Sequence, residues 1–294
     1  MVESAFPYHG VYINLDRSAG RREQMEAQLA RLGLKDRYAR FPAADGSALN
    51  VPRSTLRPGE LGCFVSHYRV LQEARGLGKC VHILEDDAVL SEHVRPVIED
   101  AAAAGPFERF DILFTDTLVS LHLGMLKGLK AAFDATALPP VRPLRLADLQ
   151  VIDLAQQNFA CTTSLVVGVN SIERVVGLYR AELDRGPTRP VDLFIRDCLQ
   201  AGTLRAACLF PFVTSFDLKE VAATTIAGGA GQAANPSVAV LAVLRYLFFV
   251  GRDLDYAKAC LDAATQHDRR PTNPHHAMIV QALEFVLSPD FQEF

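Results

Sequence analysis

The stretch from residue 58 to residue 90 constrains the fold most, because a helix, a glycine break, a buried strand and a carboxylate cluster follow one another in it. Residues 62–73 have the apolar spacing of an amphipathic helix. Residues 80–84 are short and mostly apolar, which is typical of an inner strand of a parallel sheet. The three residues after this strand all carry carboxylates. This order predicts one unit of an α/β sheet that ends in acids.

Glu85, Asp86 and Asp87 lie where the predicted strand ends. In open α/β sheets, ligands bind beyond the carboxyl ends of the strands. Adjacent carboxylates repel one another unless a cation, hydrogen-bond donors or a retained proton relieves them. Their oxygens suit a hard divalent ion such as Mn²⁺ or Mg²⁺. A solvated acidic turn or a helix N-cap explains the same spacing equally well, so spacing alone leaves both interpretations open.

The composition suits one substantial domain with an appendage. The chain has 294 residues, enough to bury a large core. Its formal net charge of −4 provides no basic footprint, so we expect no nucleic-acid partner. Six scattered cysteines without a CxxC pair predict free thiols in a reducing compartment. The first ten residues lack the basic and apolar regions of a signal peptide, and we expect a cytoplasmic protein.

Strands and helices are predicted to alternate along most of the chain. The predicted strands are residues 11–15, 80–84, 111–116, 160–169 and 204–212, and the predicted helices are residues 21–34, 62–73, 94–104, 171–183 and 193–201. A strand, a turn and a helix at the N-terminus are the usual opening of a nucleotide-binding α/β domain. We therefore expect a Rossmann-like α/β fold.

The C-terminal part has a different character. Residues 227–236 are rich in glycine and predict a linker. Beyond them, residues 237–294 predict a small helical appendage, with helices over 237–250, 254–265 and 275–287. The first of these is too short to span a bilayer, which takes about 20 residues. We expect the appendage to serve in dimerisation, in docking on a membrane surface or in covering the hydrophobic core.

No glycine-rich phosphate loop follows the first strand, so a phosphate would need other cations. Arg17, Arg21 and Arg22 supply them, because a guanidinium group binds pairs of oxygens. For Arg21 and Arg22 taken singly, a solvated helix face is the favoured interpretation. His67 lies in the helix 62–73, and a single histidine there is more often packed or exposed than catalytic.

Four blocks in order resemble glycosyltransferase family 25, the lipooligosaccharide galactosyltransferase family of bacteria, which is related to the collagen galactosyltransferases. The blocks are VYINLDRS at 11–18 followed by two arginines, FPAADG at 41–46, GELGCFVSH at 59–67 and ILEDD at 83–87. The resemblance covers roughly residues 8–226, strongly up to Asp87. It implies a glycosyltransferase A-type fold over residues 1–226. It also implies transfer of a hexose, with galactose as the expected sugar, and inversion at the anomeric carbon. A UDP-sugar is the implied donor, and a saccharide such as lipooligosaccharide is the implied acceptor.

The resemblance also implies roles for individual residues. The residues implied to bind the donor are Asn14, Asp16, Arg17, Arg22, Ser66, His67, Glu85 and Asp86. The residues implied to bind the metal ion, Mn²⁺ or Mg²⁺, are Asp87 and Glu85. Inverting transfer also needs a carboxylate that deprotonates the acceptor hydroxyl. Asp192, in a Pro-Val-Asp step like the late acidic motif of the family, is the leading base, and Asp116 is its rival. An N-cap and an ordinary polar strand end are the plainer interpretations of these two residues.

Two other functions compete with sugar transfer. A module of the same fold could bind a nucleotide or a partner without catalysis, although the retained acids and Arg17 argue against this. A nucleotidyltransferase would also use carboxylates and a divalent ion. We expect an enzyme in the cytoplasm, with peripheral contact at the inner face of the membrane as an option.

Overall fold

A computed structural model describes residues 7–119, 142–218, 242–243, 245–253, 255–257 and 259–260. The strands are β1 (Tyr8–Asn14), β2 (Tyr38–Pro42), β3 (Cys80–Glu85), β4 (Ala88–Leu90), β5 (Ile112–Phe114), β6 (Leu118–Val119), β7 (Gln150–Asp153), β8 (Phe159–Ala160), β9 (Ser164–Val167), β10 (Ala206–Phe210) and β11 (Thr214–Phe216). The helices are α1 (Ala19–Arg31), α2 (Pro58–Glu73), α3 (Val94–Ala104), α5 (Ile172–Arg185) and α6 (Val191–Gln200). The expected α/β alternation is confirmed over these residues.

A central sheet of seven strands has the order β2-β1-β3-β9-β5-β10-β7. The strand β3 is parallel to β1, as predicted, but it is antiparallel to β9 on its other side. The sheet is therefore mixed, because β9 and β7 run against their neighbours. The carboxyl ends of β1, β3 and β5 still meet at one edge, and β9 begins at that edge. The Rossmann-like sheet is confirmed, and the finer A-type assignment stays a prediction.

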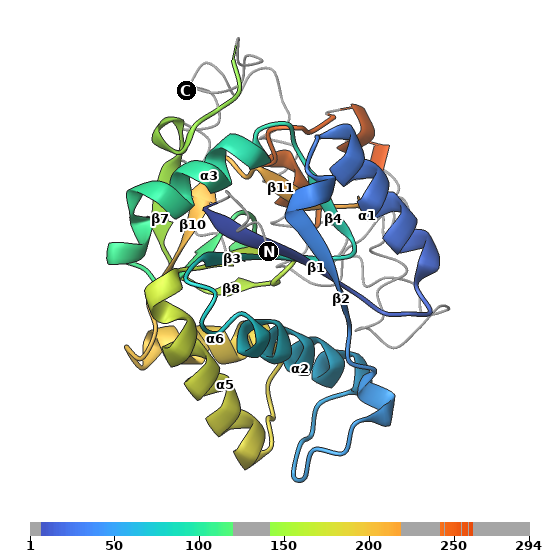
Figure 1. The fold of residues 1–294 in the computed structure, drawn as a ribbon, viewed down its shortest axis with the longest axis vertical. Helices are drawn as coiled ribbons and strands as arrows, with labels where there is room; N and C mark the ends of the chain where they lie inside the picture. Colours follow the sequence, from blue (N-terminus) through green and yellow to red (C-terminus); the bar gives the residue numbers. More distant parts are fainter. Residues whose placement is uncertain are drawn as a thin grey trace, which may run out of the picture.

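Helices cover both faces of the sheet, α1 and α3 on one side and α2, α5 and α6 on the other (Figure 1). Alternate residues of β1 serve the two layers: Val11 and Ile13 pack with the α2 side, and Tyr8 and Tyr12 pack with the α1 side. A single strand therefore contributes to two separate hydrophobic cores.

Helix α2 begins where its sequence supplies a start signal. Pro58 occupies the first turn, where its missing N–H costs nothing. The Glu60 carboxylate accepts a hydrogen bond of 2.9 Å from the backbone N–H of Arg57 and so caps the helix from within. The helix buries Leu61, Phe64 and Val65 along with its later apolar residues. It starts four residues earlier than the apolar spacing predicts, because its first turn is held by capping rather than by packing.

The predicted strand 160–169 is divided into β8 and β9. Cys161 lies between them with φ at 77°, a left-handed conformation that is uncommon for a residue with a side chain. The backbone N–H of Cys161 donates a hydrogen bond of 2.9 Å to the carboxylate of Asp192, at the start of α6. This contact holds the bend between the two short strands.

A buried polar row crosses the sheet beneath α1. Tyr38 of β2 and His82 of β3 both lie beside Gly10 of β1, and the Tyr38 hydroxyl reaches Nδ1 of His82 at 2.6 Å. A Cβ on Gly10 would lie 2.7 Å from the Tyr38 ring, so only glycine leaves room for this crossing. Burial lowers the pKa of His82 to about 3. Nε2 of His82 lies 3.0 Å from the hydroxyl of Ser164 in β9. The row is therefore neutral, and its hydrogen bonds link β2, β3 and β9.

Part of the C-terminal region packs against the core. Val250 and Phe248 exchange backbone hydrogen bonds of 2.9 and 2.8 Å with Phe212, just after β10. Tyr246 and Phe249 join the same hydrophobic core as α2 and α5. The predicted linker 227–236 and the predicted helix 275–287 lie outside the described residues, and the domain boundaries stay predictions.

Candidate donor and metal site

The cavity beside the carboxyl end of β3 has a volume of about 310 Å³. The strand ends of β1 and β3, the start of α1, the loop after β2 and one face of α2 enclose it. Its polar lining residues are Arg17, Ser18, Arg21, Asp45, Ser47, Cys63, Ser66, His67, Glu85, Asp86 and Asp87. The three consecutive acids therefore face a hollow rather than bulk solvent, which favours a binding role over a solvated turn.

Asp86 is held from two sides. The Asn14 amide donates to one carboxylate oxygen at 2.7 Å, and Arg21 lies 3.3 Å from the other. Burial raises the pKa of Asp86, while Asn14 and Arg21 oppose this effect. Asn14 in turn accepts a hydrogen bond of 3.0 Å from Arg40. The predicted residue Asn14 therefore acts on the site by positioning Asp86.

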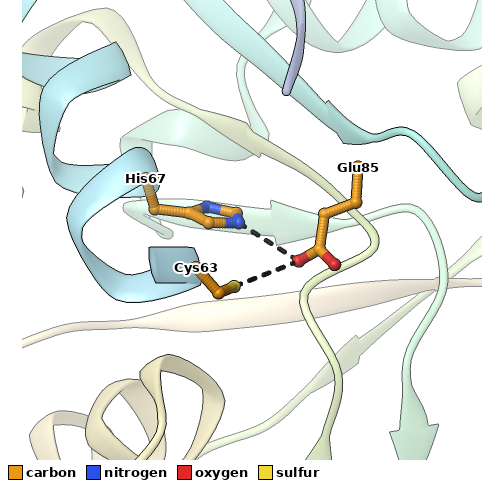
Figure 2. Close-up of side chains that lie close together, drawn as sticks. All are labelled: Cys63, His67 and Glu85. Atoms are coloured by element: carbon orange, nitrogen blue, oxygen red, sulfur yellow. Dashed lines mark hydrogen bonds and ion pairs between the residues drawn. The ribbon is translucent and has the colours of Figure 1, made fainter. Parts of the chain in front are cut away.

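Glu85 points toward α2, where Cys63 and His67 point back at it (Figure 2). Its Oε1 atom lies 3.2 Å from His67 Nε2 and 3.6 Å from Cys63 Sγ. The Thr162 hydroxyl, just before β9, donates to the same oxygen at 2.7 Å. Burial raises the pKa of Glu85, but the hydrogen bonds from His67, Thr162 and Cys63 lower it. The pKa of Glu85 is therefore below its usual value. Glu85 is thus a carboxylate whose orientation is set by three side chains.

Asp87 differs from its two neighbours in lacking such contacts. Its Oδ1 atom is buried and has no hydrogen-bond partner among the described residues. Burial raises the pKa of Asp87 to about 7, and the negative charges of Glu85 and Asp86 add to the shift. An orphaned carboxylate oxygen beside two further acids is the environment that a divalent cation would satisfy.

Residues 9–116 match the family model described as "Glycosyltransferase family 25 (LPS biosynthesis protein)". A "Glycosyltransferase 25 family member" of Drosophila pseudoobscura pseudoobscura is 35% identical over 106 residues, which are 30% of this chain and 17% of the fly protein. A protein of the same description from Drosophila melanogaster is 33% identical over 102 residues, 28% of this chain and 16% of that protein.

Residues 9–116 are therefore similar to glycosyltransferase family 25. The chain spans only about a sixth of the length of these two relatives. The family stretch contains the whole lining of the cavity, from Ile13 to Asp87. The resemblance that we drew from four sequence blocks is therefore confirmed for the part of the chain that forms the cavity.

The predicted donor-binding residues of the family 25 stretch are only partly brought together. Arg17, Ser66 and His67 line the cavity, whereas Asp16 and Arg22 do not. Asp16 is exposed and pairs with Arg40, and Arg22 lies 4.0 Å from Glu26 on the outer face of α1. Arg21, one position earlier, faces the cavity instead. One residue along a helix turns a side chain by about 100°, which sequence spacing alone could not resolve.

Ser66 supports the cavity wall. Its hydroxyl donates to the carbonyl of Gly62 at 2.6 Å and accepts from the backbone N–H of Ala44 at 2.9 Å. It is completely buried. The hydrogen bonds therefore tie the loop after β2 to α2, and Ser66 acts on the cavity as a structural support.

Neither predicted base lines the cavity. Asp116 follows β5, is fully buried and forms an ion pair with Arg245, which lies outside the family 25 stretch. Asp192 is partly exposed and accepts backbone hydrogen bonds from Cys161 at 2.9 Å and Leu193 at 2.8 Å. The N-cap interpretation of Asp192 is wrong, because Pro190 holds that position and α6 has no side-chain cap.

Sequence reasoning missed three contributors to this region: Cys63, Thr162 and Arg245. For Cys63 a signal existed, because it lies four residues before His67 and therefore on the same face of α2. Thr162 and Arg245 are distant in sequence from the residues they contact and left no local pattern.

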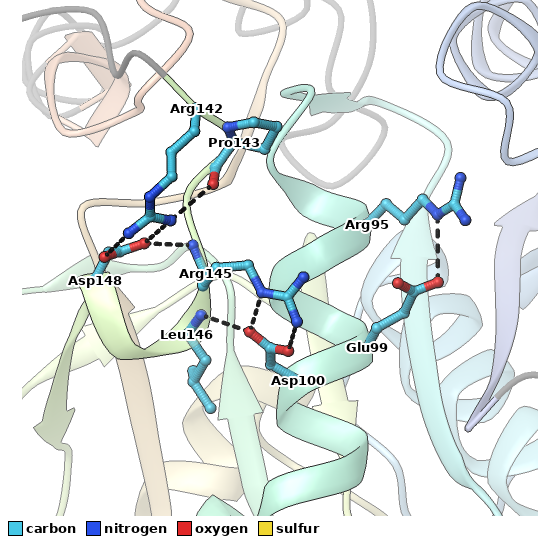
Figure 3. Close-up of polar contacts among 8 residues, drawn as sticks. All are labelled: Arg95, Glu99, Asp100, Arg142, Pro143, Arg145, Leu146 and Asp148. Atoms are coloured by element: carbon cyan, nitrogen blue, oxygen red, sulfur yellow. Dashed lines mark hydrogen bonds and ion pairs between the residues drawn. The ribbon is translucent and has the colours of Figure 1, made fainter.

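A second hollow of about 510 Å³ lies between α3 and the segment 142–148. Its arginines are already paired: Arg142 with Asp148, and Arg145 with Asp100, as Figure 3 shows. Arg95 likewise lies 3.3 Å from Glu99. The arginines of the first cavity are paired as well, Arg17 with Asp45 and Arg21 with Asp86. Only the first cavity has the buried Oδ1 of Asp87 in its lining, an oxygen without a partner among the described residues, so it is the stronger candidate for a metal-bound ligand.

Proposed function

We propose that this chain transfers a hexose from a UDP-sugar to a saccharide acceptor with inversion at the anomeric carbon. Galactose is the proposed sugar, and lipooligosaccharide is the proposed acceptor. One observation carries the proposal: three consecutive acids and two arginines of a family 25 stretch face the same cavity of about 310 Å³. A nucleoside diphosphate needs cations for its phosphates, and a divalent ion held by acids together with nearby guanidinium groups meets that need.

Asp87 and Glu85 are the residues that would hold the proposed ion, Mn²⁺ or Mg²⁺. The buried Oδ1 of Asp87, without a partner among the described residues, supports this fit. When bound, such an ion supplies Lewis-acid stabilisation of the negative charge on a departing diphosphate.

The side chains of this chain have separate tasks in the proposal. Arg17 and Arg21 bind phosphate oxygens from the side of α1, while Asn14 holds Asp86 in place. Cys63, His67 and Thr162 fix the orientation of Glu85.

Asp192 remains our first proposal for the base. It is partly exposed, whereas Asp116 is enclosed and already paired with Arg245. A base must come within hydrogen-bond reach of the acceptor hydroxyl. Asp192 would exchange its two backbone contacts for that hydroxyl.

Calorimetric titration of UDP and UDP-galactose, with Mn²⁺ and then with excess chelator, tests the donor site. We expect binding by the wild-type chain with Mn²⁺ and its loss in Asp87→Asn. Asp184→Asn is the matched control, since Asp184 is an exposed residue of α5 that pairs with Arg180. Absence of nucleotide binding under every condition would remove the main support for the proposal.

Product analysis then separates the three candidate functions. Free UDP with a lengthened glycan supports sugar transfer, whereas pyrophosphate supports a nucleotidyltransferase. Tight nucleotide binding without turnover on a panel of acceptor glycans favours a non-catalytic module.

The cellular setting of the reaction is also a proposal. Within the described part of the chain, no helix is long and apolar enough to cross a membrane. We propose a cytoplasmic enzyme with peripheral contact at the inner face of the membrane, and a homodimer formed through the C-terminal helices.

A further inference from the structure

Cys63, His67 and Glu85 bring three different metal-ligand atoms together. A sulfur, an imidazole nitrogen and a carboxylate oxygen from these residues all lie within 4.8 Å of one another. Cys63 and His67 are separated by one turn of α2, so both project from the same helix face toward the end of β3 (Figure 2). A rigid helix and a buried strand therefore hold the three side chains in place.

The two distances from Glu85 to the other ligand atoms fit a tetrahedral ion. Zinc binds sulfur at about 2.3 Å and nitrogen or oxygen at about 2.0–2.2 Å, so neighbouring ligands lie roughly 3.3–3.6 Å apart. Glu85 Oε1 lies 3.2 Å from His67 Nε2 and 3.6 Å from Cys63 Sγ. The sulfur and the imidazole nitrogen, which lie within 4.8 Å of each other, would have to lie about 3.6 Å apart around an ion.

The same cluster is accessible from the cavity. All three residues line the hollow of about 310 Å³, which gives an ion an entry path and leaves room for an exogenous fourth ligand. The ligand set contains a thiol and an imidazole, which select zinc-class ions over magnesium. The neighbouring Asp86 and Asp87 offer only oxygen, which suits the hard ion proposed for the donor.

We propose that Cys63, His67 and Glu85 form a binding site for a soft divalent cation of the zinc class, adjacent to the hard-cation site at Asp87 and sharing Glu85 with it. Binding displaces the Cys63 thiol proton to solvent and needs the His67 tautomer whose proton is on Nδ1, so a proton on Nε2 moves to Nδ1. The hydrogen bonds from Cys63 and His67 to Glu85 are replaced with bonds to the ion. The competing explanation is a plain hydrogen-bond cluster, in which the same side chains only orient Glu85.

Cobalt titration of the full-length chain distinguishes these two explanations. The chelator-treated protein is titrated with Co²⁺ alone, without nucleotide or sugar, and thiolate-to-cobalt charge-transfer absorption is recorded in the near ultraviolet. Cys63→Ser and His67→Gln each remove a metal ligand while retaining a hydrogen-bond donor for Glu85. Cys80→Ala is the matched control, because Cys80 lies at the opposite end of β3.

We expect the charge-transfer band in the wild type and in Cys80→Ala, saturating at one Co²⁺ per chain. Cys63→Ser should lack the band, and His67→Gln should bind Co²⁺ at least about tenfold more weakly. A folded wild type without the band, the same band in Cys63→Ser, or displacement by a modest excess of Mg²⁺ would overturn the proposal. If circular dichroism shows that Cys63→Ser is unfolded, the wild-type spectrum and His67→Gln decide the question.

Discussion

Arg245 and Asp116 form a buried ion pair, with 5% and 0% of their side chains exposed. The Arg245 guanidinium also lies 4.5 Å from the centre of the Phe216 ring, a cation–π contact. Asp116 is the last residue of the family 25 stretch, and Arg245 lies 129 residues further along the chain. The described residues around Arg245 are therefore part of the core of the protein.

Replacing Arg245 with Met should destabilise the protein strongly. The substitution leaves the Asp116 carboxylate buried without its cation, and loss of one partner from such a pair typically costs about 3–5 kcal/mol. The double variant Asp116→Asn/Arg245→Met should recover much of this loss, because it removes both charges. Urea unfolding of Arg245→Met, Asp116→Asn, the double variant and the wild type measures the coupling.

The exposed pair formed by Arg75 and Glu173 is the control for this cycle, with 49% and 64% of the side chains exposed. Arg75→Met should leave the unfolding midpoint close to that of the wild type, because water screens exposed pairs. Equal effects of the two arginine substitutions would contradict the buried ion pair.

The contribution of Asp87 to the stability of the metal-free protein should fall as the pH rises from about 4 to 7. The pKa of Asp87 is raised from 3.8 to about 7, so the folded chain holds a proton that the unfolded chain releases over this range. The unfolded state then binds fewer protons, and stability declines with pH. Asp87→Asn removes this contribution and should be the more stable protein at pH 8 by roughly 1–4 kcal/mol. Urea unfolding at pH 5 and pH 8 compares the wild type with Asp87→Asn. If the difference in unfolding free energy between the two proteins is the same at both pH values, the raised pKa of Asp87 is refuted.

Gly46→Ala should open the cavity wall. An added Cβ would lie 1.7 Å from the carbonyl oxygen of Pro58, so the loop after β2 would have to move away from α2. We expect a loss of at least about 2 kcal/mol in unfolding free energy, with weaker nucleotide binding. Gly20→Ala is the control, because nothing lies within 4 Å of its added Cβ in α1. That variant should gain up to about 1 kcal/mol, and a comparable loss in both variants would contradict the close approach at Gly46.

Arg21 and Arg22 should differ sharply in their effect on donor binding. Arg21 lines the cavity and contacts Asp86, whereas Arg22 does not line it. Arg21→Gln should weaken UDP binding in the presence of Mn²⁺ by about 10- to 100-fold, the range for loss of a charge-assisted hydrogen bond. Arg22→Gln should change it less than about twofold. Calorimetry on both variants measures this difference. A larger loss of UDP affinity in Arg22→Gln than in Arg21→Gln would place the diphosphate outside the cavity.

Local patterns in the sequence were enough to predict most helices and strands and the position of the three acids. An apolar run followed by Glu85, Asp86 and Asp87 can be recognised within ten residues. Its position at a ligand-binding edge follows from the rule that ligands bind beyond the carboxyl ends of strands in α/β sheets. The helix 94–104 has the same local character, and the structure confirms it. The predicted strand 111–116 is confirmed in its central part, Ile112–Phe114. Local periodicity is a short-range property, so the sequence reveals it directly.

The direction of each strand in the sheet and the contact partners of the buried side chains were decided by the tertiary structure alone. The apolar spacing of residues 164–167 is the same whether β9 runs parallel or antiparallel to β3. Asp116 is an ordinary strand end until Arg245 folds back onto it, and Glu85 is one of three acids until Cys63, His67 and Thr162 surround it. These contacts join residues between 18 and 129 positions apart, and packing of the whole chain determines them.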